Sequence, residues 1–336
     1  MAGFAEIAGR VVVITGASSG IGRAAALAFA KHGAAVVLAA RNAEQLEDAA
    51  QDCRVSGGKA LVVPTDVADA AAVSALAQAA VTAFGRIDVW INNAGVGVIG
   101  PFVDTPMELH RRTLEVDLLG AFHGAHAVLP RFVEQGEGIL INTVSMGGWS
   151  PPPFAAAYSA SKFGLRALTS SLRQEMFEHP RIHVCGVFPA LVDTPGIASA
   201  ANTSGKAINA GPYLYAAEDV AQAFVALVRR PRDEVAVGWL ARAAQISYSL
   251  MPAATERLGF AVMRKALGKA RPAPYGEGAL LATTDAPRST DGGWRHTKGM
   301  PSARTIDRGL LASILIAAIG LAALARHRKP TRDDHA

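Results

Sequence analysis

A tyrosine and a lysine stand four residues apart in the segment AYSASKFGL, residues 157–165. On a helix, this spacing places Tyr158 and Lys162 one turn apart on a single face. A cation beside a phenol favours the phenolate form, which suits a group that must take up and release a proton. The same spacing also arises by chance on solvated helices, so the pair alone leaves both catalysis and a surface contact open.

A glycine-rich turn lies between an apolar run and a helical stretch near the amino end. The segment VVVITGASSGIGRAAALAF, residues 11–29, spaces Gly16, Gly20 and Gly22 as G-x-x-x-G-x-G. Glycines permit a tight turn and close approach of the backbone, and a helix N-terminus offers unpaired amides and a positive dipole end. An ordinary glycine turn is the alternative, but this placement between a buried run and a helix predicts binding of a nucleotide pyrophosphate.

The second apolar run ends in LAARN, where Arg41 follows Ala40. A site for NAD usually carries an acidic residue at this place, which accepts hydrogen bonds from the ribose hydroxyls. A carboxylate would repel the 2′-phosphate of NADP, whereas a guanidinium would pair with it. We therefore expect NADP(H), with NAD(H) as the alternative cofactor. Arg41 could also be a solvated residue that follows a strand.

Seven short apolar runs, separated by helical segments, must position these residues. The runs are RVVVITG, AAVVLAA, ALVVPTDV, RIDVWINNAG, GEGILINTVS, RIHVCGVFPA and EVAVG. Strands that are apolar throughout and separated by helices indicate a parallel sheet buried on both faces. The predicted fold is a doubly wound, Rossmann-like α/β sheet in a single catalytic domain, with ligands at the carboxyl ends of its strands.

Several motifs in this order resemble those of the short-chain dehydrogenase/reductase family, over about residues 8–240. TGASSGIG at 15–22 resembles the family's cofactor loop, NNAG at 92–95 its fourth-strand motif, and YSASK at 158–162 its active-site signature. Ser145 precedes Tyr158 at the usual separation, and FPALVDTP resembles the motif after the sixth strand, with Ala190 where glycine is usual. The resemblance implies hydride transfer between a nicotinamide and a carbonyl or alcohol.

The resemblance also implies roles for single residues. Tyr158 would be the general acid/base, Lys162 would favour the phenolate and reach the nicotinamide ribose, and Ser145 would donate to the substrate oxygen. Asp66 would bond the adenine amino group, although it could also cap the helix that follows. Besides Tyr158 and Lys162, the residues implied to bind the cofactor are Gly16, Ser18, Ser19, Gly20, Ile21, Gly22, Arg41, Asp66, Val67, Asn93, Gly95, Pro189, Val192 and Thr194.

One predicted catalytic residue departs from the family pattern. Asp117, in EVDLLGAFHGA, stands where the family usually has asparagine. In relatives this position helps to hold a water molecule that links the lysine to solvent. A backbone carbonyl could still do so, whereas an ionised carboxylate would raise the pKa of Lys162. The departure bears on the proton relay more than on the reaction itself.

Composition and charge exclude several classes of function. The net charge of +5 is diffuse and the basic residues do not alternate with aromatic ones, so the chain has no nucleic-acid footprint. Cys53 and Cys185 form neither a disulfide framework nor a metal motif, and no metal site is predicted. Cys185 lies in an apolar run and is expected in the core. The first ten residues lack the pattern of a cleaved secretion signal.

The carboxyl-terminal part has a different character. We expect a catalytic domain over 1–250, a helical extension and Pro/Gly-rich linker over 251–305, a hydrophobic helix over 306–328 and a charged tail over 329–336. The uncharged stretch 310–325 is slightly shorter than a spanning helix and predicts a membrane anchor, with a packed or interfacial helix as the alternative. NADPH supply places the catalytic domain in the cytoplasm, and the resemblance implies a homo-oligomer.

The substrate region follows the sixth strand. Residues 195–219 are expected to form a mobile lid, and Trp149 and Phe154 follow Ser145 closely in the sequence. These rings either line an apolar pocket for a lipophilic carbonyl or alcohol substrate, or pack helices together. The alternative function is a non-catalytic nucleotide-sensing or scaffold protein on the same fold, which Asp117 and Ala190 favour.

Overall fold

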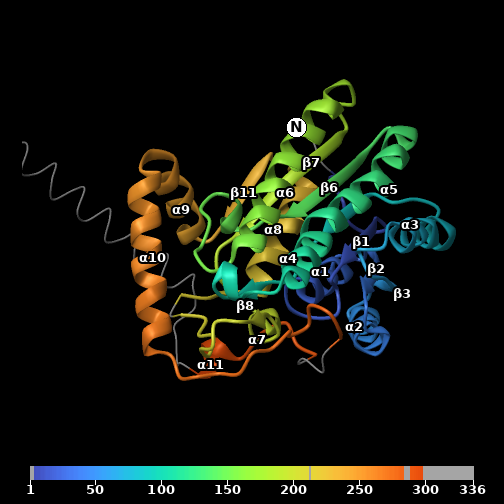
Figure 1. The fold of residues 1–336 in the computed structure, drawn as a ribbon. Helices are drawn as coiled ribbons and strands as arrows, with labels where there is room; N and C mark the ends of the chain where they lie inside the picture. The colour runs from blue at the N-terminus through green and yellow to red at the C-terminus, as the bar shows by residue number, and fades with distance from the viewer. Residues whose placement is uncertain (1–3, 212, 284–287, 298–336) are drawn as a thin grey trace, which may run out of the picture.

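The centre of the fold is a seven-stranded parallel sheet with the order β11-β7-β6-β4-β1-β2-β3 (Figure 1). The computed structural model describes residues 4–211, 213–283 and 288–297. Each of the seven apolar runs forms one strand, so the predicted doubly wound sheet is confirmed. The strands are β1 (Val11–Thr15), β2 (Ala35–Ala40), β3 (Lys59–Pro64), β4 (Val89–Asn92), β6 (Gly138–Thr143), β7 (Ile182–Pro189) and β11 (Glu234–Val237).

Two apolar cores lie on the two faces of this sheet. Alternate residues of β1 point to opposite faces, with Val12 and Ile14 in one core and Val11 and Val13 in the other. The first core includes residues of α1 (Gly20–Lys31), α2 (Ala43–Val55) and α8 (Ala217–Arg229), and the second includes residues of α3 (Ala70–Phe84) and α5 (Gly120–Gln135). Because both faces are covered, the residues of the central strands are mostly apolar.

The remaining elements include α6 (Ala156–Glu175), which packs Leu172 against the second core, and the shorter segments that follow the strands. Before α5, the helix α4 (Met107–Leu114) continues through a π-helical turn, η2 (Glu115–Leu119). The other elements are β5 (Val98–Ile99), η1 (Phe102–Asp104), η3 (Met146–Gly148), η4 (Met176–Glu178), β8 (Val192–Asp193), α7 (Pro195–Ala198), β9 (Ala201–Asn202), β10 (Tyr215–Ala216), α9 (Trp239–Leu250), α10 (Pro252–Lys269) and α11 (Trp294–Thr297).

The strand order changes direction between β1 and β4, and this switch point is where doubly wound sheets bind ligands. At this point the last residue of β1 bonds the segment that follows β4. The Thr15 hydroxyl accepts hydrogen bonds from the amides of Asn93 and Ala94, each at 3.0 Å. The loops that follow β1 and β4 are therefore held side by side at the carboxyl edge of the sheet.

After α10 the chain turns back across this edge. We call the described residues 271–283 and 288–297 the strap; Figure 1 shows it as an orange to red segment that runs from the foot of α10 past α7 towards α2. Antiparallel bridges join it to the region after β8, between Asn202 and Gly276 and between Lys206 and Pro272. The sequence predicts a linker here, whereas the described part is bonded to the domain.

The prediction of a membrane protein is corrected. Across residues 4–211, 213–283 and 288–297, no helix is both long enough and apolar enough to cross a bilayer. The 18-residue α10, for example, carries Arg257, Arg264, Lys265 and Lys269. The stretch 310–325, on which the prediction of an anchor was based, lies outside the described residues, as do the whole of 306–328 and the charged tail.

Candidate active site

Tyr158 and Lys162 lie one turn apart on α6, and their side chains are neighbours. The Lys162 Nζ atom is 5.5 Å from the centroid of the Tyr158 ring. The Lys162 side chain is only 6% exposed, whereas Tyr158 is half-buried. Small residues on the same helix, Ser159 and Ser161, are buried and allow the helix to lie close to the sheet. The site therefore places a buried ammonium beside a partly exposed phenol.

Ser145 follows β6 and lies next to the same tyrosine. The Gly147 amide donates to the Ser145 Oγ atom at 3.2 Å. A Cβ atom added to Gly147 would lie 3.2 Å from Cε1 of Tyr158 and 3.6 Å from Ser145 Oγ. A side chain at position 147 would therefore crowd the tyrosine ring, and the serine hydroxyl and the tyrosine ring border the same small space.

The backbone of Ser145 is strained, which gives a testable difference between two variants. Its φ of +102° and ψ of 155° lie in a region that is essentially restricted to glycine and costs other residues about 1–3 kcal/mol. Ser145→Gly should therefore have a free energy of unfolding at least about 1 kcal/mol higher than Ser145→Ala. Both variants lack the hydroxyl, so both should lose activity. Urea unfolding measures the difference, and equal stabilities would contradict the strain.

Asp117 lies in η2 and forms a buried ion pair with the lysine. Its Oδ1 atom accepts a hydrogen bond from the Val96 amide at 2.7 Å, and its Oδ2 atom is 3.3 Å from Lys162 Nζ. The Asp117 side chain is fully buried. Lys162 also donates to the Thr143 carbonyl at 3.3 Å. The ammonium is thus held between the end of β6 and the π-helical turn, a type of local irregularity that is frequent at functional sites.

The pKa values of the pair are shifted in the same direction for different reasons. Burial raises the pKa of Asp117 above its usual range and outweighs the opposing effects of Lys162 and the Val96 amide. Burial lowers the pKa of Lys162, but the charges of Asp117 and Tyr158 outweigh it and raise that pKa. This is the direction that the sequence predicts for a carboxylate at position 117. Because its pKa is raised, Lys162 keeps its proton at neutral pH.

The turn after β1 has the shape of a phosphate-binding loop. Gly16 has a φ of +67°, and a Cβ atom there would lie 2.8 Å from Ala94 Cα. A Cβ atom on Gly22 would lie 2.1 Å from the Gly16 carbonyl oxygen. The amides of Ile21 and Gly22 precede the first intrahelical hydrogen bond of α1, which Arg23 donates to Ser19. The cradle and its amides fit a pyrophosphate group.

The side chain of Asn93 supports this loop. Its Nδ2 atom donates to the carbonyl oxygens of Thr15 at 3.0 Å and Gly16 at 3.4 Å. The resemblance implied a place near the adenosine ribose, and the structure uses the amide to hold the phosphate loop in shape. Gly95, which follows closely, lies beside the lysine, because a Cβ atom there would be 3.5 Å from Lys162 Nζ.

The strap lies on residues that the sequence predicts to bind the cofactor. The Gly20 amide donates to the Ser289 carbonyl at 2.9 Å. Arg41 donates to the carbonyls of Ala279 and Leu280, the latter at 3.4 Å. The buried Asp193 accepts hydrogen bonds from three strap amides, those of Gly292 at 3.0 Å, Trp294 at 3.2 Å and Arg295 at 2.8 Å. Arg41 is therefore not simply a solvated residue after a strand.

The carboxylate of Asp66 lies near Arg41 and bonds a residue that the sequence did not reveal. Its Oδ1 atom accepts from the Ala68 amide at 3.0 Å, and its Oδ2 atom is 2.5 Å from a guanidinium nitrogen of Arg112. The cap of α3 is Asp69, which accepts from the first amides of that helix, so the reading of Asp66 as a helix cap is wrong. Arg112 lies on α4, and in the sequence only its position five residues before Asp117 places it near a predicted site residue.

The other predicted cofactor residues fall into two groups. Thr194 faces the phosphate loop, because a Cβ atom on Gly20 would lie 3.1 Å from Thr194 Cβ. Ser18, Ser19 and Ile21 are half-buried in or next to that loop. By contrast, the side chains of Val67 and Val192 belong to the two cores, and Pro189 is the buried last residue of β7. These three can present only backbone or a side-chain edge to a ligand.

The rings near Ser145 serve mainly to pack the fold. Trp149 is 3% exposed and stacks on Phe188 with ring centroids 3.8 Å apart. Phe154 lies 6.3 Å from Phe260 of α10, centroid to centroid. Of the two readings of Trp149, packing is therefore the one that the structure shows. Cys53 and Cys185 are both unpaired and buried in the first core, and burial raises the pKa of each thiol to about 12.

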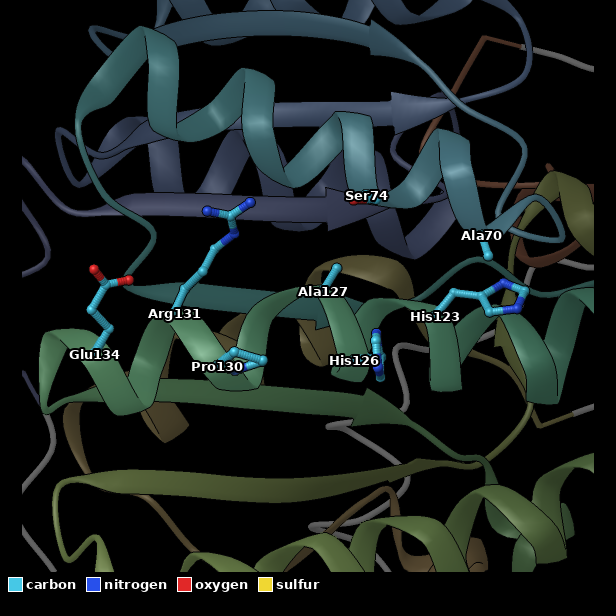
Figure 2. A pocket seen from close by; sticks show the side chains of 8 residues that line it. All are labelled: Ala70, Ser74, His123, His126, Ala127, Pro130, Arg131 and Glu134. Atoms are coloured by element: carbon cyan, nitrogen blue, oxygen red, sulfur yellow. The ribbon is translucent and has the colours of Figure 1, made fainter.

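A groove on another part of the surface lies between α3 and α5 (Figure 2). It is lined by Ala70, Ser74, His123, His126, Ala127, Pro130, Arg131 and Glu134. His123 bonds the Val67 carbonyl at 2.9 Å, and Arg131 donates to Gln78 across the groove at 3.3 Å. Neither Tyr158 nor Lys162 lines this groove.

Comparisons with known proteins agree with this geometry. A family model described as short chain dehydrogenase matches residues 10–204. The uncharacterised oxidoreductase YxnA of Bacillus subtilis is 31% identical over 325 residues, which cover 95% of this chain and 91% of that protein. The match therefore continues well past residue 204.

The fold of this chain is similar to those of solved short-chain dehydrogenases. A short chain dehydrogenase/reductase from Burkholderia phymatum in complex with NAD has a TM-score of 0.64 at 28% identity, and the match covers 80% of this chain and 99% of that one. A metagenomic short-chain oxidoreductase in complex with NADP has a TM-score of 0.60 at 31% identity, covering 69% and 97%.

Proposed function

Because the chain belongs to the short-chain dehydrogenase/reductase family, we propose that it transfers hydride between NADP(H) and a carbonyl compound or secondary alcohol. Membership makes it an oxidoreductase with a nicotinamide cofactor. The observation that carries the proposal is the buried Lys162 ammonium, 5.5 Å from the ring centroid of the partly exposed Tyr158. This pair lies on the carboxyl side of the same sheet as the glycine cradle, as hydride transfer to a neighbouring carbonyl requires.

The proposed roles follow from the chemistry of each side chain. Tyr158 gives a proton to the carbonyl oxygen during reduction and takes it back from the hydroxyl during oxidation. The charge of Lys162 favours the phenolate form that oxidation requires. Ser145 donates a hydrogen bond to the same oxygen, where negative charge develops. The cofactor, when bound, supplies or accepts the hydride.

Asp117 acts in this scheme by positioning the lysine. The carboxylate is fixed by the Val96 amide and in turn holds the Lys162 ammonium at 3.3 Å. A neutral asparagine could fix the same backbone but would not attract the charge. The proposed consequence is a lysine that keeps its proton and its place throughout the reaction.

Two guanidinium groups support the preference for NADP(H). Arg41 follows β2, and Arg112 comes close to the end of β3 through its ion pair with Asp66. Residue 40, where an NAD site usually carries a carboxylate, is alanine. NAD(H) remains the alternative, since related structures hold either NAD or NADP.

A direct test is to mix the full chain with NADPH and a panel of small and lipophilic ketones, and to follow the loss of the absorbance of the reduced nicotinamide. We expect turnover on at least one ketone class, faster with NADPH than with NADH. Faster turnover with NADH would overturn the cofactor preference, and binding of NADPH without turnover on any ketone or alcohol would overturn the enzymatic function.

The strap favours a second candidate, a nucleotide-binding protein without turnover. It bonds Gly20 and Arg41, two residues predicted to bind the cofactor, and so covers part of the crevice. Such a protein would respond to a nucleotide by moving the strap, and its response would be the same in wild type and Tyr158→Phe. The panel described above distinguishes the two candidates.

A further inference from the structure

Two arginines converge on one acceptor at the edge of the cofactor crevice. Arg41, after β2, and Arg112, on α4, each donate to the carbonyl oxygen of Leu280 at 3.4 Å. Arg41 also donates to the carbonyl of Ala279. The two guanidinium groups come from elements far apart in the sequence, and the strap backbone is the point where they meet.

The two groups are close enough to repel each other. Burial lowers the pKa of Arg41, and the charge of Arg112 lowers it further, while Asp66 opposes both effects. Asp66 itself keeps its charge, because the Ala68 amide and Arg112 outweigh the effect of burial and lower its pKa. Arg112 also lies 3.7 Å from Glu115, which pairs with Arg111 at 3.2 Å. Three guanidinium groups therefore share two carboxylates and leave a net positive charge at this place, which neutral carbonyl oxygens compensate only in part.

The strap is held by other contacts that do not involve these arginines. The Leu280 side chain is 1% exposed and packs with Val98, Leu109, Ala157 and Ala201. The Ala279 amide donates to the Ser199 carbonyl at 2.8 Å, and Asp193 binds strap amides further along. These contacts therefore hold the carbonyls of residues 279 and 280 beside the two arginines.

We propose that Arg41 and Arg112 form a subsite for a phosphomonoester, the 2′-phosphate of the cofactor, and that the strap carbonyls of residues 279 and 280 occupy this subsite in the closed protein. NADP(H) then displaces the strap, whereas NAD(H), which lacks this phosphate, does not. The inference rests on the proposed function, since it takes the crevice to be a nicotinamide site. It adds Arg112 as a specificity residue and a competitor within the chain.

The competition follows from the strength of the bonds. Hydrogen bonds from a guanidinium to an ionised oxygen are roughly twice as strong as those between neutral groups, and a phosphate can take two parallel bonds from each arginine. A carbonyl offers one partly charged oxygen. The phosphate and the strap carbonyls need the same guanidinium donors. The apparent affinity for the phosphate is therefore the intrinsic affinity multiplied by the fraction of molecules in which the strap is open.

The first experiment measures hydrogen exchange of the strap amides 271–283 in the full chain. The probes are adenosine 2′,5′-bisphosphate and 5′-AMP, which differ only in the 2′-phosphate, each at saturation, followed by NADPH and NADH. We expect the 2′-phosphate probes to raise exchange of this segment several-fold and the others to leave it unchanged. Lower exchange with NADPH would mean that the strap closes over the cofactor, and would overturn the inference.

The second experiment compares neighbouring arginines on α4. Arg112→Gln should weaken binding of adenosine 2′,5′-bisphosphate by about tenfold or more and change the affinity for 5′-AMP less than about twofold. Arg111→Gln is the matched control, because the Arg111 side chain is 68% exposed and pairs with Glu115. Calorimetry gives both affinities. An equal effect of the two variants, or an equal effect on the two probes, would remove Arg112 from the subsite.

A third variant loosens the strap without touching the arginines. Leu280→Ala removes the buried anchor and keeps the carbonyl, so it should tighten binding of adenosine 2′,5′-bisphosphate by about tenfold while 5′-AMP binds as before. Tyr275→Ala is the control, since Tyr275 is 51% exposed in the same strap. Unchanged affinity in Leu280→Ala would overturn the competition.

The outcomes separate the inference from the proposed function. If neither mononucleotide nor dinucleotide binds the full chain, both fail. If NADPH binds and is turned over while the strap amides keep their exchange rates, the inference alone fails. If the strap opens with NADPH but no ketone or alcohol is converted, the inference stands and the enzymatic function fails.

Discussion

Replacing Tyr158 with phenylalanine should lower kcat for ketone reduction by about 10²- to 10⁴-fold, the usual contribution of a positioned general acid or base. Phenylalanine keeps the ring beside Lys162 and Gly147 and removes only the hydroxyl, so the fold should be unaffected. The substrate oxygen would then have to take its proton from solvent. Steady-state kinetics with NADPH and the best ketone of the panel measure the loss.

The controls for this variant address folding and cofactor binding. Tyr248→Phe removes another phenol, one that donates to Glu256 at 2.9 Å on α9 and α10, and it should leave kcat unchanged. The Kd for NADPH should also stay within about threefold of the wild-type value, because Tyr158→Phe removes one hydroxyl and leaves the other residues implied to bind the cofactor in place. A variant that retained more than a tenth of the wild-type kcat would show that another group moves the proton.

Replacing Lys162 with methionine should have the largest effect on stability, because it leaves the Asp117 carboxylate fully buried without its ammonium partner. Removing one member of a buried ion pair costs about 3–5 kcal/mol in the free energy of unfolding. Activity should fall as well, since the phenol loses its neighbouring charge. Urea unfolding at neutral pH gives the change in stability, and a loss below about 1 kcal/mol would contradict the buried pair.

The sign of the pH dependence of this variant can be worked out. Burial already raises the pKa of Asp117, and without Lys162 the charge that opposes burial is lost, so that pKa rises further. The folded protein then binds this proton more tightly than the unfolded chain. The stability that depends on it is present at acidic pH and is lost as the pH rises through the raised pKa. Lys162→Met should therefore be less destabilised in mild acid than at neutral pH.

A double variant separates charge from catalysis. Asp117→Asn combined with Lys162→Met removes both charges, while the asparagine oxygen can still accept the Val96 hydrogen bond. Most of the lost stability should return and the pH dependence should disappear, but activity should stay low. A double variant as unstable as Lys162→Met would show that the lysine stabilises the fold through contacts other than the ion pair.

The sheet could be predicted from the sequence because its signal is local and repeated. Each strand, such as Val11–Thr15, is a run of apolar residues, and burial on both faces leaves no other pattern. The neighbourhood of Tyr158 and Lys162 followed in the same way from helical spacing. The helix cap was harder to predict, because Asp66 and Asp69 stand three residues apart and only the backbone path shows that Asp69 is the cap.

The strap could not be predicted, because its composition is that of a linker and its bonds are made by backbone groups. Ser289, for example, contributes a carbonyl to Gly20, and any residue could provide that carbonyl. Trp149 raised a similar difficulty, since an aromatic ring after Ser145 suits a pocket as well as a core. Whether it stacks on Phe188 depends on the position of β7, which the residues around 149 do not encode.

The contact between Arg41 and Leu280 joins residues 239 positions apart. A ribosome must therefore synthesise the whole dinucleotide-binding half, the active-site helix and α10 before the strap exists. Until then, the loops after β1 and β2 lack the strap contacts to Gly20 and Arg41. Closure of so long a loop comes late in folding, so in a newly made chain the loops after β1 and β2 exist before the strap that covers them.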